Sequence, residues 1–222
     1  MEQFIKSPRS DRWFIAMAVA GLLIFSLSLS LLMVPYSTVI EENEGGDLTC
    51  LHIPFTKSRA AAILNSYNAE ALEAAQSLHF PGDLIFPIGY ALLYAGLIGL
   101  LLRGQQGWWL RAGLVVLALP FVAMLFDWIE NLFILRMLAI TAEEGAAAIP
   151  ARLPLFGGIA GSIKYVALSL VTPLFGIALI TRSTLTRQPP LTKWRIVTFL
   201  VALSLLAFNL VQLITGVLPC LS

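Results

Sequence analysis

Charged residues are scarce in this chain: only 12% of its 222 residues are Asp, Glu, Lys or Arg, while 58% are hydrophobic. Soluble domains usually carry about 25% charged residues, which face water. The shortage of charge therefore predicts that much of the surface faces lipid. The formal net charge is +1, so a nucleic-acid partner is not expected, because such partners bind to strongly basic faces that neutralise phosphates.

Common signatures of catalysis and cofactor binding are also missing. The sequence contains no HExxH, CxxC, GxSxG, P-loop or GxGxxG motif, so it gives no support for the usual metal, nucleophile or nucleotide sites. Its only histidines, His52 and His79, lie between the first two long apolar runs, and we expect them to be solvated there. Haem held between spans is therefore not expected, and neither a cofactor nor a metal is predicted.

Long apolar runs are abundant, by contrast. A helix that crosses a membrane needs about 20 mostly apolar residues, because each residue rises about 1.5 Å across a hydrocarbon core of about 30 Å. Five segments qualify, at about residues 13–35, 84–102, 108–138, 158–181 and 194–217. We therefore predict an all-α fold: one polytopic transmembrane helix bundle of five spans that occupies residues 1–222.

The basic residues indicate how this bundle is oriented. Nine lie in the N-terminal tail and in the loops after the second and fourth spans, whereas only Lys57, Arg59 and Arg152 lie in the loops on the other side. Cytoplasmic loops are enriched in Lys and Arg, so we predict a cytoplasmic N-terminus and a C-terminus outside.

The predicted outer loop, residues 36–82, is the one sizeable segment outside the spans. Its alanine-rich stretch, from about Ser58 to Leu78, predicts one or two short helices with Ser58 and Asn68 as N-caps. Cys50 in this loop and Cys220 after the fifth span face the same oxidising compartment if there are five spans. The two cysteines then either form a disulfide or remain separate thiols.

Glycines recur at helix-packing intervals in two of the spans. They are Gly89, Gly96 and Gly99 in the second span and Gly157, Gly158 and Gly161 in the fourth. Small residues at such spacing let helices approach closely. Packing within the bundle is favoured over self-association.

Polar residues inside the spans gather at one depth. Asp127, Glu130 and Asn131 lie at i, i+3 and i+4 of the third span, and hence on one helix face. By helical rise, Asp127 lies about 24 Å from Arg111, and Lys164 about 27 Å from the cytoplasmic end of its own span. The remaining polar residues near this depth are Asp83, Tyr90, Tyr165, Asn209 and Gln212. The sequence thus predicts a polar layer in the outer third of the bilayer.

Two interpretations of this layer stay open. A charge at the bilayer centre costs about 2.5–3.5 kcal/mol, so these groups should face inward and pair. Because Lys164 neutralises only one of Asp127 and Glu130, the acids invite a shared proton, as acid–base catalysis requires. Alternatively, the same groups hold the spans together through hydrogen bonds worth about 0.6 kcal/mol each. Asp127, Glu130 and Lys164 are the catalytic candidates, and the binding candidates are Tyr90, Asn131, Tyr165, Asn209, Gln212 and Asp83.

Three runs, PGDLIFPIGYALLYAG, FDWIENLFIL and SIKYVALSL, form a recognisable pattern. An acid opens one span, a D-x-x-E-N run lies in the next, and a lysine follows in the span after. In Asp83, Asp127, Glu130, Asn131 and Lys164 the chain resembles small bacterial multi-pass membrane proteins of unassigned function. The resemblance covers about half of the chain and implies the bacterial cytoplasmic membrane, the cell inner membrane, but no activity.

Two classes of function fit these features. The first, which the sequence favours, is a structural or accessory membrane component that assembles with another membrane protein. The second is a membrane-embedded enzyme or binder of a lipid-like ligand that enters from the outer leaflet, with Asp127 and Glu130 as acid–base groups and Lys164 orienting them. A channel or coupled transporter is disfavoured, because the cytoplasmic half of the bundle offers no polar path.

Overall fold

The computed structural model describes residues 8–42, 48–103 and 105–186, and the predicted fifth span lies outside them. The described residues contain helices and no strand. The α-helices are α2 (Pro8–Ser28), α3 (Val34–Glu42), α4 (Leu48–Leu51), α5 (Lys57–Asn65), α6 (Ala69–Ser77), α7 (Asp83–Leu102), α8 (Gly107–Glu144), α9 (Arg152–Tyr165) and α10 (Thr172–Thr186). Short π-helical turns (Leu29–Met33, Leu78–Gly82 and Val166–Val171) and a 3-10 turn (Ala146–Ala148) complete the chain of helices. The all-α prediction is confirmed for this part of the chain.

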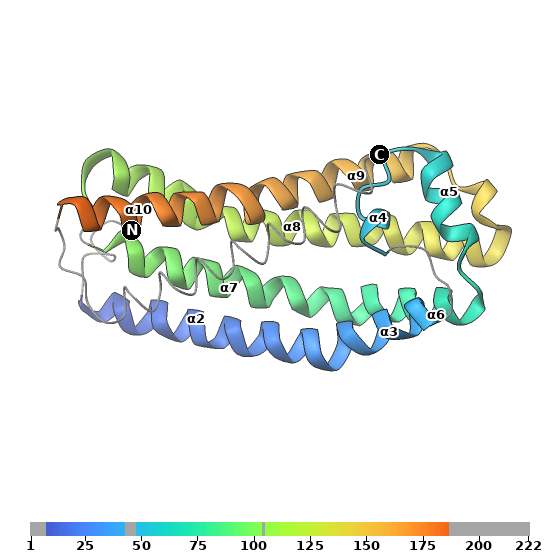
Figure 1. Cartoon of the computed structure of the whole chain (residues 1–222), viewed down its shortest axis with the longest axis horizontal. Coiled ribbons are helices and arrows are strands. Elements are labelled where there is room, and N and C mark those ends of the chain that lie inside the picture. Colours follow the sequence, from blue (N-terminus) through green and yellow to red (C-terminus); the bar gives the residue numbers. More distant parts are fainter. Residues whose placement is uncertain (1–7, 43–47, 104, 187–222) are drawn as a thin grey trace.

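Several of these elements join end to end into four long helical segments, the second of which is kinked at Phe80, where φ is −145° and ψ is 112°. They run over Ser10–Glu42, Ala69–Leu102, Gly107–Glu144 and Arg152–Arg182, and each is long and apolar enough to cross a membrane. They lie side by side in an up-and-down order, each antiparallel to the one before it (Figure 1). The first four predicted spans fall inside them, but each segment is longer than its apolar run, because further helical turns adjoin the run.

Glycines set the close packing of α2 against α7. A β-carbon at Gly89 would lie 2.5 Å from the backbone nitrogen of Phe25, and one at Gly96 would lie 2.6 Å from that of Ala18. Both distances are shorter than real contacts, so only glycine lets the two backbones come this close. The prediction that these two glycines pack inside the bundle is therefore confirmed.

The short helices α4, α5 and α6 gather at one end of the bundle, which we call the loop-side end (Figure 1). The side chain of Asn68 accepts a hydrogen bond from the Ala71 N–H at 2.8 Å and caps α6, as predicted. The cap of α5 is Thr56, which accepts from the Arg59 N–H at 3.3 Å. The prediction of Ser58 as the cap is wrong, because α5 begins at Lys57 and Ser58 already lies in its first turn.

A hydrophobic core fills the loop-side end. Its fully buried side chains come from α3, α4, α5, α6, α8 and the turn after α6, and include Ile40, Leu51, Leu64, Leu78, Ile134 and Leu138. This core attaches the short helices to the far half of α8. It thereby covers the end of the bundle next to the polar residues of α7, α8 and α9.

Candidate functional site

Lys164 of α9 lies between the two acids of α8. Its Nζ is 3.0 Å from Oδ1 of Asp127 and 2.6 Å from Oε2 of Glu130. The exposed fractions of the three residues are 7%, 2% and 0%. Oε2 of Glu130 receives no aligned hydrogen bond from the described residues, so its contact with Lys164 is mainly one of charge. The structure thus brings all three catalytic candidates together, and one lysine serves both carboxylates.

The D-x-x-E-N run also anchors α8 to the first turn of α7. The Asn131 side-chain nitrogen donates to the backbone oxygen of Asp83 at 3.2 Å, and the Trp128 indole donates to that of Leu84 at 3.1 Å. Pro87 lies inside α7 and has no N–H, so the Asp83 oxygen, four residues earlier, lacks its helical donor. Asn131 supplies that donor.

Tyr90 extends the cluster onto α7. Its hydroxyl donates to Oδ2 of Asp127 at 2.9 Å, and only 2% of the residue is exposed. Asp83, another binding candidate, is 3% exposed at the start of the same helix. Tyr165 follows Lys164, whose Nζ lies 5.0 Å from the centre of the Tyr165 ring. Each of these candidates therefore lies in the same layer.

His52 is the principal residue that sequence reasoning missed. It lies between α4 and α5, and its Nδ1 is 2.6 Å from Oε1 of Glu130. Only 13% of its side chain is exposed, so the expectation that it is solvated is wrong. The chain folds back here onto the bundle, and the imidazole reaches a carboxylate of α8.

Glycines of α9 provide the space for this contact. A β-carbon at Gly161 would lie 2.5 Å from the His52 backbone oxygen and 2.9 Å from Oε1 of Glu130. One at Gly158 would lie 2.8 Å from the ring of Phe55, whose φ of +49° is unusual for a residue with a side chain. The spacing of these two glycines was the sequence signal for close packing at this position. The segment that packs against them is a loop, whereas we had expected a helix.

His79 is also buried against expectation. It is fully buried, its ring centre lies 5.5 Å from that of His52, and its Nδ1 is 2.8 Å from the backbone oxygen of Ala75. No set of three or more His, Cys, Asp or Glu side chains arranged for a metal ion is found among the described residues.

Contacts of 2.6–3.0 Å connect five titratable side chains in a row. The order is His52, Glu130, Lys164, Asp127 and Tyr90, and we call this set the polar cluster. It joins the loop-side segment to α7, α8 and α9. Chemically it is a series of proton donors and acceptors that begins at a partly exposed histidine and ends inside the bundle.

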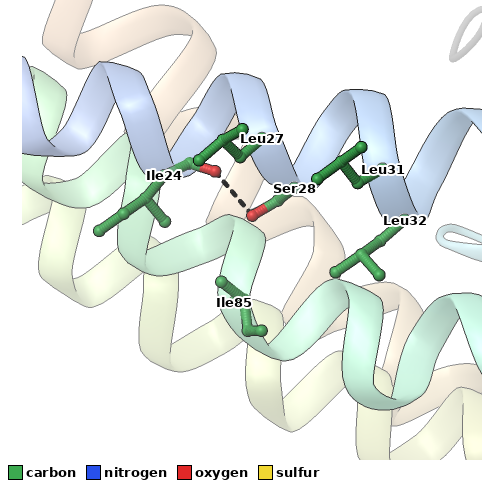
Figure 2. Close-up of a pocket in the computed structure, with 6 residues that line it drawn as sticks. All are labelled: Ile24, Leu27, Ser28, Leu31, Leu32 and Ile85. Atoms are coloured by element: carbon green, nitrogen blue, oxygen red, sulfur yellow. Dashed lines mark hydrogen bonds between the residues drawn. The ribbon is translucent and has the colours of Figure 1, made fainter.

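An apolar groove lies on another face of the bundle. Its volume is about 260 Å³, and Ile24, Leu27, Ser28, Leu31, Leu32 and Ile85 line it (Figure 2). The Ser28 hydroxyl donates to the backbone oxygen of Ile24, so the groove offers little free polarity. Ile85 lies about 140° around α7 from Tyr90, the α7 residue of the polar cluster, at 100° per residue. The groove therefore faces away from the polar cluster and suits hydrocarbon chains.

Three of the candidates, Asn209, Gln212 and Cys220, lie outside the described residues. No described cysteine is free, and the bridge between Cys50 and Cys220 stays a prediction. No protein-family model, curated protein or solved structure matches the chain. The resemblance to small bacterial membrane proteins therefore stays a prediction as well.

Proposed function

We propose that the protein is a membrane-embedded acid–base enzyme or binding protein for a lipid-like molecule, with the polar cluster as its site. The observation that carries this proposal is the unbroken series of contacts from His52 to Tyr90. Glu130 is its centre, because it contacts both the lysine of α9 and the histidine of the loop-side segment.

The residue types in this series suit proton transfer. Imidazole, carboxylate, ammonium and phenol groups act as general acids and bases when they lie within hydrogen-bonding reach. His52, at 13% side-chain exposure, connects the series to the compartment outside the bundle. In the proposed reaction Glu130 or Asp127 accepts a proton from the substrate and later returns one to the product, which restores the carboxylate. Lys164 stabilises the negative charge left on the substrate in between, and His52 exchanges protons between Glu130 and water.

A lipid-like substrate fits the surroundings of this site. Large apolar side chains are exposed on the same helices, among them Leu125, Leu132, Ile163 and Val166, so a molecule dissolved in lipid can approach from the side. We propose that the cluster lies toward the outer leaflet of the bacterial cytoplasmic membrane, in a chain with five spans and a cytoplasmic N-terminus. The distribution of Lys and Arg supports this orientation.

Lipid mass spectrometry on purified protein tests the proposal. The chain is reconstituted into vesicles of a bacterial lipid extract, and bound and converted lipids are compared for the natural protein and Glu130→Gln. This substitution keeps the shape and a hydrogen bond but removes the charge and the basicity. We expect a converted or specifically retained lipid, and we expect Glu130→Gln to reduce its amount at least tenfold.

Glu143→Gln is the matched control, because Glu143 is an exposed acid of the same helix. It should behave as the natural protein does. Equal lipid profiles for the natural protein and Glu130→Gln would rule out the acid–base site.

A structural or accessory role is the second candidate, and one observation favours it. Lys164 lies within 3.0 Å of both acids, as expected of ion pairs that fasten helices together. In that case Glu130→Gln leaves the lipid profile unchanged but releases a membrane protein that copurifies with the natural chain.

A further inference from the structure

We infer that the site recognises its ligand by the ligand's hydrogen-bond donors, a hydroxyl or ammonium group, which His79 Nε2 and Asn131 Oδ1 accept. The inference rests on the proposed function and names the chemical class of its ligand. It follows from which buried atoms of this layer already have partners and which do not.

His79 presents one acceptor atom. Its Nδ1 lies 2.8 Å from the backbone oxygen of Ala75, and because a carbonyl only accepts, Nδ1 carries the proton. In the neutral imidazole the other nitrogen, Nε2, is then an acceptor. Nε2 is buried, and no donor from the described residues reaches it. An unsatisfied buried polar atom is costly, so a donor at this position stabilises the protein.

Asn131 presents a second acceptor by the same reasoning. Its side-chain nitrogen donates to the backbone oxygen of Asp83 at 3.2 Å, and this contact fixes which end of the amide is the oxygen. The oxygen, Oδ1, is buried in a residue that is 1% exposed, and no described residue donates to it.

The two acceptors flank the polar cluster. The His79 ring centre is 5.5 Å from that of His52, which contacts Glu130, and Asn131 follows Glu130 directly in α8. Both residues are also connected to Asp83. His79 precedes Asp83 by four positions in the chain, and Asn131 donates a hydrogen bond to the Asp83 backbone oxygen. A donor group that reaches either acceptor therefore lies in the same layer as Glu130, the proposed base.

The charges of the layer restrict the ligand further. Among the described residues, the acidic side chains of Asp83, Asp127 and Glu130 are buried together with one lysine, Lys164. That lysine already contacts Asp127 and Glu130. Another anion such as phosphate would meet acidic side chains and acceptor atoms rather than hydrogen-bond donors. A hydroxyl or an ammonium group meets the partners that it needs, so we exclude a phosphate group from this position.

Four probes with the same chain length test the inference. They are monopalmitoylglycerol (hydroxyls), hexadecylamine (an ammonium group), hexadecyl phosphate (an anion) and methyl palmitate (no donor). Dissociation constants are measured by native mass spectrometry on the full chain in nanodiscs. We expect monopalmitoylglycerol, hexadecylamine or both to bind about tenfold more tightly than methyl palmitate, and hexadecyl phosphate to bind no better than methyl palmitate. Whichever donor probe binds identifies the donor group.

Two variants remove one acceptor each. His79→Asn keeps a donor near the position of Nδ1 and removes Nε2, and Asn131→Leu removes Oδ1 together with the amide nitrogen. Each should abolish the tenfold preference, and either one suffices if the other does not fold. Glu73→Gln, an exposed change on α6, should keep it.

Three outcomes would overturn the inference. All four probes could bind equally, which would mean that water alone satisfies the acceptors. Hexadecyl phosphate could bind most tightly, or the preference for a donor group could survive in both variants. The proposed function fails separately. If Glu130→Gln changes no lipid while the donor preference is present, the site binds without acid–base chemistry. If Glu130→Gln blocks lipid conversion while the preference for donor probes is absent, the proposed enzyme function is supported and the inference about the ligand is wrong.

Discussion

Replacing Lys164 with methionine should destabilise the protein more than replacing Lys164 and Asp127 together. Methionine matches the length of the lysine stem but carries no charge. Without the ammonium group, Glu130 still has His52, whose Nδ1 is 2.6 Å away. Among the described residues, Asp127 keeps only the Tyr90 hydroxyl, and no described cation replaces Lys164 beside it.

The magnitude follows from the burial of these groups. Breaking one side of a buried ion pair costs about 3–5 kcal/mol, and Lys164 and Asp127 are 7% and 2% exposed. For a chain of this length, each kcal/mol shifts the melting temperature by about 2–4 °C, which gives a decrease of roughly 6–20 °C for Lys164→Met. In the double variant Lys164→Met/Asp127→Asn no charge is stranded at this position, and the asparagine oxygen still accepts from Tyr90. We expect it to recover about 2 kcal/mol of the loss.

Thermal unfolding in one detergent measures the full cycle of single and double variants. Arg152→Met is the matched control, because it removes an exposed cation from the same helix, and it should change the free energy of unfolding by less than about 0.5 kcal/mol. If the losses of the single variants add within about 0.5 kcal/mol, Lys164 and Asp127 are not energetic partners, and the reasoning is refuted.

Three further predictions concern packing and topology. Gly96→Ala should cost about 1–3 kcal/mol in thermal unfolding, because its β-carbon would lie 2.6 Å from the backbone of α2. The control Gly176→Ala should be tolerated, because the nearest atom to its β-carbon would be 3.7 Å away. Equal effects of the two substitutions would contradict the α2–α7 contact. Gly161→Ala should displace the segment around His52 and raise its hydrogen exchange, whereas unchanged exchange would mean that the segment is not held by this contact. Reporter fusions after Arg187 and at Ser222 should report opposite sides of the membrane, and a shared side would remove one span from the prediction.

The helices and the polar layer follow from short-range patterns. The apolar runs predict four described helices, and counting residues along them places Asp127 and Lys164 at one depth, where the structure has Nζ and Oδ1 3.0 Å apart. The calculation works because helical rise is constant and because a charge in an apolar bundle needs a partner. It also places Glu130 and Asn131 on the correct face of α8.

The contribution of the loop-side segment could not be predicted in this way. His52 is separated from Glu130 by 78 residues, and no periodicity relates a loop position to a helix position. Its burial depends on the missing β-carbon of Gly161 and on the left-handed backbone of Phe55. Both the close approach at Gly161 and the backbone of Phe55 are features of the folded chain. The sequence alone is equally compatible with a solvated loop.

The length of α8 has an electrical consequence. The helix has 38 residues, or about 57 Å at 1.5 Å per residue, nearly twice the thickness of the hydrocarbon core. If it enters the hydrocarbon at Gly107 and runs along the membrane normal, it leaves about 20 residues later, at Asp127. The polar cluster then lies where most of the transmembrane voltage has already dropped. Moving a charge across the whole field takes about 2.3 kcal/mol per 100 mV, but a proton that enters at His52 crosses little of it. Turnover by the proposed enzyme should therefore proceed at the same rate in energised and de-energised vesicles.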